Sequence, residues 1–183
     1  FQVLTRAVAA QRAGQAEEAA RLYEQVLACE PRNADALHLL GVVMAERGEA
    51  GRAAQLMAEA LRASPCQPTV HFNYANLLHA QGALREALAH YDIATGLDPG
   101  AAQAWYNRGN CLERMALTED SLASFEQALR VRPAYPAAML NRGVAQQKLG
   151  DFDAAAGSFR AALAMRPGYV QALCNLGNVL RIQ

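Results

Sequence analysis

The side chains best suited to bind another molecule are asparagine amides that recur at a fixed spacing. Members of the main set lie 34 residues apart, at Asn73, Asn107, Asn141 and Asn175. A second set follows three residues later, at Asn76, Asn110 and Asn178. Three residues are close to one helical turn, so both sets would share a face of helical segments. The first question is therefore what repeated amides on one helix face could do.

An amide can donate and accept hydrogen bonds, but asparagine is a mediocre helix former. Its recurrence in the middle of helices therefore needs a reason. One reading is structural, in which each amide links neighbouring helices. The other is functional, in which the amides pair with the backbone of an extended peptide and place little demand on its side chains.

Other residues with chemical potential form no catalytic pattern. The histidines are His38, His71, His79 and His90, and there is no H-E-x-x-H, P-loop or G-x-S-x-G string. The acidic pairs Glu17-Glu18 and Glu119-Asp120 are placed to complement helix dipoles. We predict no catalytic residue, no metal site and no cofactor, so the chain is not expected to be an enzyme.

The cysteines also lack a metal-binding or disulfide pattern. No C-x-x-C pair occurs among Cys29, Cys66, Cys111 and Cys174. We expect buried or half-buried free thiols, which favour a reducing, cytoplasmic location.

Prolines show that the asparagine spacing belongs to the whole chain. Consecutive members of one set are 34 residues apart: Pro31, Pro65, Pro99, Pro133 and Pro167. A fixed period of this length indicates a repeat architecture, in which each unit buries its apolar face against its neighbours.

Each repeat is predicted to be a pair of helices. In the third copy we expect helices at 70–80 and 84–96, joined through Gln81-Gly82. Pro68 and Pro136 suit the first turn of a helix, where a missing N–H costs nothing. The glycines expected to close first helices in a left-handed conformation are Gly14, Gly48, Gly82 and Gly150.

Some repeat positions stay small and one stays large. The small positions include Ala7, Gly41, Ala75, Gly109 and Gly143, and also Ala60, Ala94, Ala128 and Ala162. The large position holds Tyr23, Met57, Tyr91, Phe125 and Phe159. We expect helix backbones to approach closely at the small positions, with the large side chains filling the space beside them.

The chain resembles the tetratricopeptide repeat family. The string Trp105-Tyr106-Asn107, followed by Gly109, Leu112, Phe125, Ala128 and Pro133, has the family's pattern, and similar strings begin at Leu140 and Cys174. The resemblance implies an all-α, right-handed superhelical solenoid of antiparallel helix pairs with a concave face lined by first helices. We expect one domain over 1–183, with repeats at 1–33, 34–67, 68–101, 102–135 and 136–169 and a partial sixth at 170–183.

Departures from the family pattern are local. Ala116 and Ser121 replace the usual Gly and Ala in the fourth copy, so its turn, expected over 115–120, is the least typical. His71 stands where a large apolar residue is expected, and arginine replaces the commonest leucine at Arg6, Arg108 and Arg142.

The asparagine set resembles the repeat region of O-GlcNAc transferases, where such amides hold substrate polypeptide. The match fails in the first two copies, at Thr5 and Leu39. A competing template is the carboxylate clamp of chaperone-binding repeats, but Phe72, Tyr106 and Ala137 occupy the places of its lysines. The predicted peptide-binding residues are Phe72, Asn73, Asn76, Tyr106, Asn107, Asn110, Arg114, Asn141, Asn175 and Asn178.

Composition narrows the choice of partner. The formal net charge is zero, which argues against a nucleic-acid footprint. No apolar run approaches the roughly 18 residues of a membrane helix. The chain starts at Phe1 and stops within an expected first helix, so we expect a fragment of a longer protein. Its open end, with Leu173, Leu176 and Leu180, could support homo-oligomers.

We therefore predict a protein-interaction scaffold that holds an extended peptide or protein segment in its concave groove. The first alternative is the substrate-recognition arm of a larger bacterial glycosyltransferase of the O-GlcNAc transferase type. The second is a self-association module.

Overall fold

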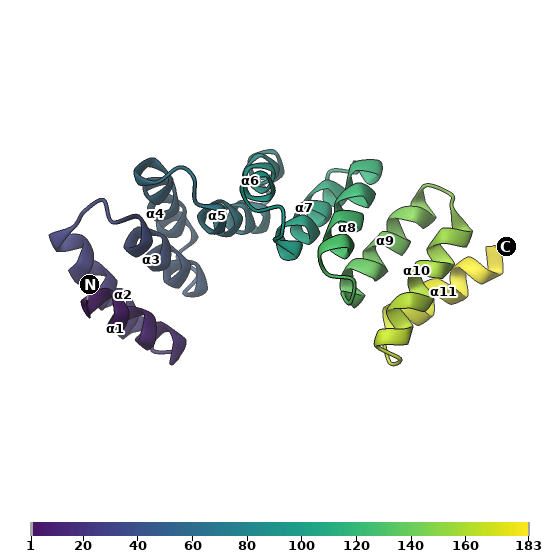
Figure 1. The fold of residues 1–183 in the computed structure, drawn as a ribbon, viewed down its shortest axis with the longest axis horizontal. Helices are drawn as coiled ribbons and strands as arrows, with labels where there is room; N and C mark the ends of the chain where they lie inside the picture. The colour runs from purple at the N-terminus through teal and green to yellow at the C-terminus, as the bar shows by residue number, and fades with distance from the viewer. Residues whose placement is uncertain (1, 183) are drawn as a thin grey trace. The chain divides into compact units, whose positions relative to one another are not determined.

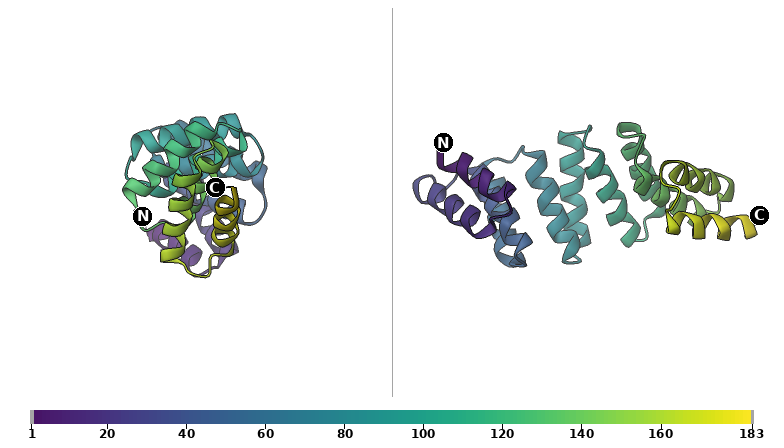
Figure 2. Two further views of the ribbon diagram at one scale, coloured as in Figure 1. Left: turned by 90° about the vertical axis from the view of Figure 1, so that its right-hand side faces the viewer. Right: turned by 90° about the horizontal axis from the view of Figure 1, so that it is seen from below.

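The helix pairs predicted from the sequence are present in the computed structural model, which describes residues 2–182. Those residues form eleven helices and no strand (Figures 1 and 2). In chain order the helices are α1 (Gln2–Arg12), α2 (Ala16–Cys29), α3 (Ala34–Glu46), α4 (Ala50–Ala63), α5 (Pro68–Ala80), α6 (Leu84–Leu97), α7 (Ala102–Arg114), α8 (Thr118–Val131), α9 (Pro136–Lys148), α10 (Phe152–Met165) and α11 (Val170–Ile182). The predicted fold class, an all-α solenoid of antiparallel helix pairs, is confirmed.

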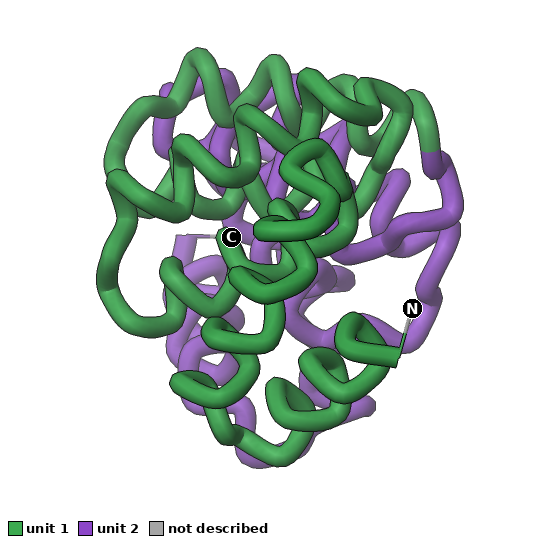
Figure 3. The backbone as a smooth tube through the Cα atoms, turned by 90° about the vertical axis from the view of Figure 1, so that its left-hand side faces the viewer, with its two compact units in different colours: residues 1–97 green, residues 98–183 purple. Residues whose placement is uncertain are grey.

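The helices group into two compact units (Figure 3). Unit 1 is Phe1–Leu97 and unit 2 is Asp98–Gln183. In unit 1 the main packing partners are α1 with α2, α3 with α4, and α5 with α6. In unit 2, α7 packs with α8, α9 packs with α10, and α11 lies against α10 and α9.

Small and large residues interlock between the helices of a pair. Gly143 on α9 lies so close to Phe159 on α10 that a Cβ at position 143 would be 2.5 Å from the ring. Gly109 has the same relation to Phe125, also at 2.5 Å. The predicted small positions on the second helices, Ala60, Ala94, Ala128 and Ala162, are buried. Gly109 and Gly143 are thus the places where a large side chain meets the facing helix.

The turns within the pairs have the expected backbone. The predicted glycines have positive φ angles: 74° at Gly14, 80° at Gly48, 82° at Gly82 and 85° at Gly150. In the fourth copy Ala116 takes this conformation, with φ 58°. The turn of that copy is shorter than predicted, because α8 already begins at Thr118.

Local sequence fixes several helix starts. Pro68 and Pro136 occupy the first turns of α5 and α9, as predicted. The side chain of Asn33 caps α3 by accepting a hydrogen bond from the Ala36 N–H at 2.9 Å. In the third copy the observed helices extend beyond the predicted ranges by two residues at the start of α5 and by one at the end of α6.

The burial predicted for the cysteines is wrong at three of four positions. All four are free thiols, but only Cys111 is buried. Cys29 ends α2, Cys66 lies in the loop before α5, and Cys174 is on the exposed part of α11. Helix ends and loops face solvent, so these thiols are accessible.

Candidate functional site

The predicted binding residues lie on first helices of the pairs. Unit 1 has Phe72, Asn73 and Asn76, all on α5, and unit 2 has the others, on α7, α9 and α11. The arginine is exposed, as is Asn178, and the remaining predicted residues are half-buried.

In unit 1 the amide of Asn73 links two first helices. Its Nδ2 lies 2.8 Å from Nε2 of His38 on α3. Burial lowers the pKa of His38, and Asp35 opposes this only in part. A neutral His38 can accept the hydrogen bond through Nε2, so Asn73 ties α5 to α3.

Asn76 makes its contact inside its own helix pair. Its Oδ1 accepts a hydrogen bond of 2.7 Å from the hydroxyl of Tyr91, a fully buried residue on α6. Phe72 also packs near Tyr91, with ring centroids 6.4 Å apart. These contacts give Asn76 and Phe72 a structural role in unit 1.

In unit 2 the amides of α7 and α9 meet. Nδ2 of Asn141 donates to Oδ1 of Asn110 at 2.7 Å and to the hydroxyl of Tyr106 at 3.4 Å. Asn107 instead accepts a hydrogen bond of 3.2 Å from Gln103 in its own helix. The predicted ladder is therefore an amide and tyrosine cluster over two first helices.

The end of unit 2 has amides in a more open setting. Asn175 is half-buried and Asn178 is exposed on α11. Within residues 2–182 neither side chain forms a hydrogen bond. Near the end of α7, Glu113 is paired with Lys148 of α9.

Sequence reasoning missed an aromatic group beside this cluster. The Tyr135 ring centroid is 5.0 Å from that of Tyr106, and its hydroxyl donates to Oε1 of Gln103 at 2.8 Å. Burial raises the pKa of Tyr135 and of Tyr169, and the neighbouring Tyr106 adds to both effects. All three rings are half-buried, and the raised pKa values keep the phenols of Tyr135 and Tyr169 protonated at neutral pH.

A sequence signal for these tyrosines was available. The string Arg-Pro-x-Tyr occurs at 132–135 and again 34 residues later at 166–169. In each copy the arginine stacks on its tyrosine, with the guanidinium carbon 4.3 Å from the Tyr135 centroid and 4.9 Å from that of Tyr169.

The unusual arginines of unit 2 are explained by small partners on the second helix. Arg108 Nη1 donates to the buried Ser124 Oγ at 2.6 Å, and Arg142 Nε donates to the buried Ser158 Oγ at 2.9 Å. The serines leave room that a larger residue would fill. These arginines therefore hold helix pairs together.

His71 also has a structural partner. Its Nε2 lies 2.9 Å from the carbonyl oxygen of Pro65, and its Nδ1 lies 2.8 Å from Nδ1 of His90. A carbonyl only accepts, so Nε2 of His71 must donate, and one Nδ1 of the two histidines donates to the other. The pair fastens the loop before α5 to α6.

Two further observations concern metals and membranes. Among residues 2–182 no three side chains of the His, Cys, Asp or Glu types come together as a metal site. None of the described helices is long and apolar enough to cross a membrane.

The chain belongs to the tetratricopeptide repeat family. The family model matches residues 4–68, 72–115, 114–170 and 145–183. These matches cover most of the chain, in agreement with its helix pairs.

Two characterised relatives match parts of the chain. Protein O-mannosyl-transferase TMTC1 of Mus musculus is 32% identical over 95 residues, covering 50% of this chain and 10% of that protein. BBSome complex member BBS4 of Bos taurus is 37% identical over 62 residues, covering 34% of this chain and 12% of that protein. The chain thus matches only about a tenth of the length of either relative.

Solved structures share the fold. PilF of Pseudomonas aeruginosa has a TM-score of 0.88 at 20% identity, with 99% of this chain and 82% of that chain covered. YrrB, a TPR protein with an unusual peptide-binding site, has a TM-score of 0.82 at 20% identity, over 93% of this chain and 88% of YrrB. MamA also scores 0.82, at 19% identity, over 90% of this chain and 96% of MamA. At these identities the likeness shows the fold alone.

Proposed function

We propose that this chain is a non-catalytic scaffold that binds an extended peptide or protein segment along the first helices of unit 2. The observation behind the proposal is the half-buried cluster of Asn110, Asn141 and Tyr106. Family membership supports a role in protein interaction, and the similar structure YrrB has a peptide-binding site.

The amides of the cluster keep hydrogen-bonding capacity after their mutual contacts are counted. Asn141 uses its nitrogen, which leaves its oxygen to accept, and Asn110 uses its oxygen, which leaves its nitrogen to donate. Together they offer one acceptor and one donor group, which matches the N–H and C=O of an extended backbone. The adjacent rings of Tyr106 and Tyr135 supply apolar surface for a side chain of the peptide.

A peptide-display selection tests the proposal. Peptides selected on the 183-residue chain should lose binding when Tyr106 is replaced by alanine. The matched control is Phe72→Ala, which removes a ring of the same class from unit 1. Selection of no peptide, or equal loss in both variants, would count against binding at unit 2.

A second candidate is a substrate-recognition arm of a larger glycosyltransferase. It is favoured by the partial match to an O-mannosyl-transferase and by the amide pattern. The test is transfer of a radiolabelled sugar to acceptor peptides by the product of the whole gene. Loss of transfer in an Asn141→Ala variant would support this role. Absence of transfer by the unsubstituted protein would argue against it.

A further inference from the structure

We propose that the two Arg-Pro-x-Tyr loops of unit 2 bind side-chain carboxylates, so that the partner of this face is an acidic peptide. The inference rests on the proposed function and specifies its ligand. It differs from a carboxylate clamp because the cations come from inter-repeat loops and the carboxylates from side chains of the peptide.

Each loop holds its arginine against the ring of its own tyrosine. Arg132 lies over the Tyr135 ring at 4.3 Å, and Arg166 lies over the Tyr169 ring at 4.9 Å. Stacking occupies one face of each guanidinium and leaves its N–H edge for a planar acceptor. Both arginines are exposed, and neither forms an ion pair within residues 2–182. A carboxylate matches such an edge with two parallel hydrogen bonds.

Tyr106 connects the first loop to the amide cluster. Its ring packs against Tyr135, and its hydroxyl accepts from Asn141. A peptide whose backbone pairs with the amides would therefore pass close to Tyr135, on which Arg132 stacks. Its acidic side chains would meet Arg132 there, and Arg166 stands in the equivalent loop one repeat further along.

The loops of unit 1 have different chemistry. In the first of them, Glu30 stands at the place of the arginine and accepts a hydrogen bond of 2.7 Å from Asn33, which replaces the tyrosine. In the second, Ser64 and Gln67 take these places. In the loop at 98–101, which begins unit 2, Asp98 and Ala101 take these places. The pairing of arginine with tyrosine is thus a property of the loops at 132–135 and 166–169, and charge complementarity selects acidic peptides at those two loops.

Binding of three labelled peptides measures this selectivity. The peptides share one alternating backbone with a central leucine and an amidated C-terminus, and carry glutamate, glutamine or lysine at the variable positions. We expect the glutamate peptide to bind about three- to tenfold tighter than the glutamine peptide, as two exposed ion pairs would give. Added salt should reduce the difference. The lysine peptide should bind weakest.

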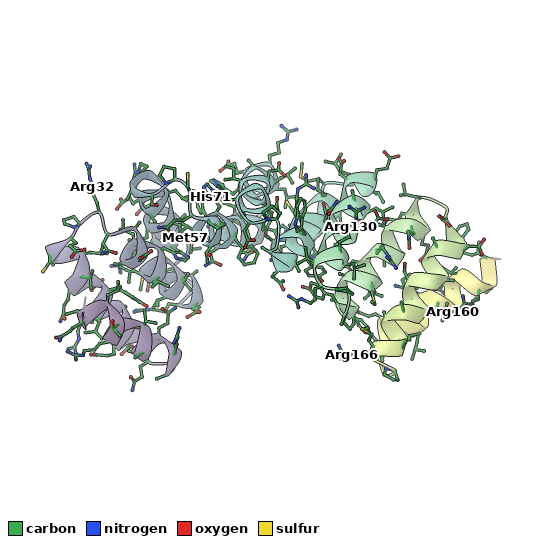
Figure 4. The ribbon with its side chains drawn as sticks, viewed as in Figure 1. Arg32, Met57, His71, Arg130, Arg160 and Arg166 are labelled. Carbon is green, nitrogen blue, oxygen red and sulfur yellow. The ribbon has the colours of Figure 1, made fainter. Side chains whose placement is uncertain are left out.

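The decisive variant is Arg132→Gln with Arg166→Gln. It should bind the glutamate and glutamine peptides equally. The matched control is Arg130→Gln with Arg160→Gln, which removes two exposed arginines from α8 and α10 (Figure 4). The control should keep the preference for glutamate, and melting curves should show that both variants are folded.

Each outcome has a distinct meaning. Equal binding of the glutamate and glutamine peptides by the unsubstituted chain overturns the inference but leaves the proposed function standing. An equal effect of both arginine pairs, or tighter binding of a single-stranded oligonucleotide than of the glutamate peptide, also overturns it. Failure of all three peptides to bind overturns the inference and the proposed function together.

Discussion

At the scale of single residues, the packing of each helix pair in unit 2 depends on a large side chain on one helix facing a small residue on the other. Gly143 leaves room for the Phe159 ring, and Arg142, its neighbour on α9, donates a hydrogen bond to the small Ser158 on α10. The equivalent residues Gly109 and Arg108 do the same on α7. A change at one member of a pair should therefore be felt directly by the other.

Gly143→Ala tests this matching. The added methyl would sit 2.5 Å from the Phe159 ring, so the helix pair must shift. Overpacking typically costs about 1–3 kcal/mol, and the better helix propensity of alanine offsets up to about 1 kcal/mol. We expect a net loss of about 1–2 kcal/mol in the free energy of unfolding, measured by urea denaturation.

The control is Gly157→Ala on α10, where a Cβ would meet nothing within 4 Å. It should raise the free energy of unfolding by up to about 1 kcal/mol through helix propensity alone. Equal effects of the two substitutions would show that α9 and α10 do not approach as described.

Histidine protonation gives a second prediction for residues of unit 1. Burial lowers the pKa of His38, and the nearby Asp35 raises it in part. Burial and the neighbouring His71 lower the pKa of His90, and Glu86 raises it in part. The unfolded chain then binds protons more readily than the folded chain. Stability should be full above the ordinary histidine pKa of about 6.5 and should fall as pH drops through the lowered values.

Urea midpoints measured across this range check the sign. His38→Gln keeps a neutral acceptor for Asn73 but cannot titrate, so it should flatten the dependence. A midpoint that rises on acidification, or an unchanged slope in the variant, would contradict the assignment.

At the scale of elements, the turn between α7 and α8 is the one that departs from the family pattern. Ala116 adopts φ 58°, where glycine serves in the other pairs. An alanine in the left-handed region costs roughly 1–2 kcal/mol, and glycine removes this cost. Glycine also raises the entropy of the unfolded chain, which offsets about 0.4–1 kcal/mol of the gain. Ala116→Gly should therefore stabilise the chain by about 0.5–1 kcal/mol in thermal or urea unfolding.

Gly150→Ala at the equivalent turn, φ 85°, should destabilise it. Stabilisation in both variants would mean that the φ angle is not the cause.

The elements themselves were predictable because their signals are local. Proline at the start of α5 and glycine after it act within a few residues, so the helix bounds followed closely from the sequence. The candidate site was less predictable because its contacts join different repeats. Asn73 was identified from its spacing, but its bond to His38 spans α3 and α5. Tyr135 lies in a loop, outside the helix face on which the prediction concentrated.

At the scale of the whole molecule, α11 leaves apolar surface uncovered within the described residues. Leu173 is 50% exposed and Leu180 is 48% exposed. Leu176, also expected at this open end, is instead half-buried against the core of unit 2, because it faces α9 and α10.

We expect the 183-residue chain to associate as its concentration rises, with α11 in the contact. Light scattering at low and high concentration measures the mass. Replacing Leu173 and Leu180 by glutamine should restore the monomer mass. A constant monomer mass for the unsubstituted chain would contradict the expectation.

The proposed function requires the amides of unit 2 to bind a peptide as well as each other. Asn110→Ala with Asn141→Ala removes both sides of their mutual bond, so it leaves no orphaned partner in the pair and should cost little stability. Loss of two backbone hydrogen bonds, each about 0.5–1.5 kcal/mol, should weaken peptide affinity about five- to a hundredfold. The decisive measurement is affinity by titration calorimetry and melting temperature on this one double variant. Affinity for unrelated peptides should fall by this factor, while the melting temperature should stay nearly unchanged. A lowered melting temperature with unchanged affinity would contradict the proposed function.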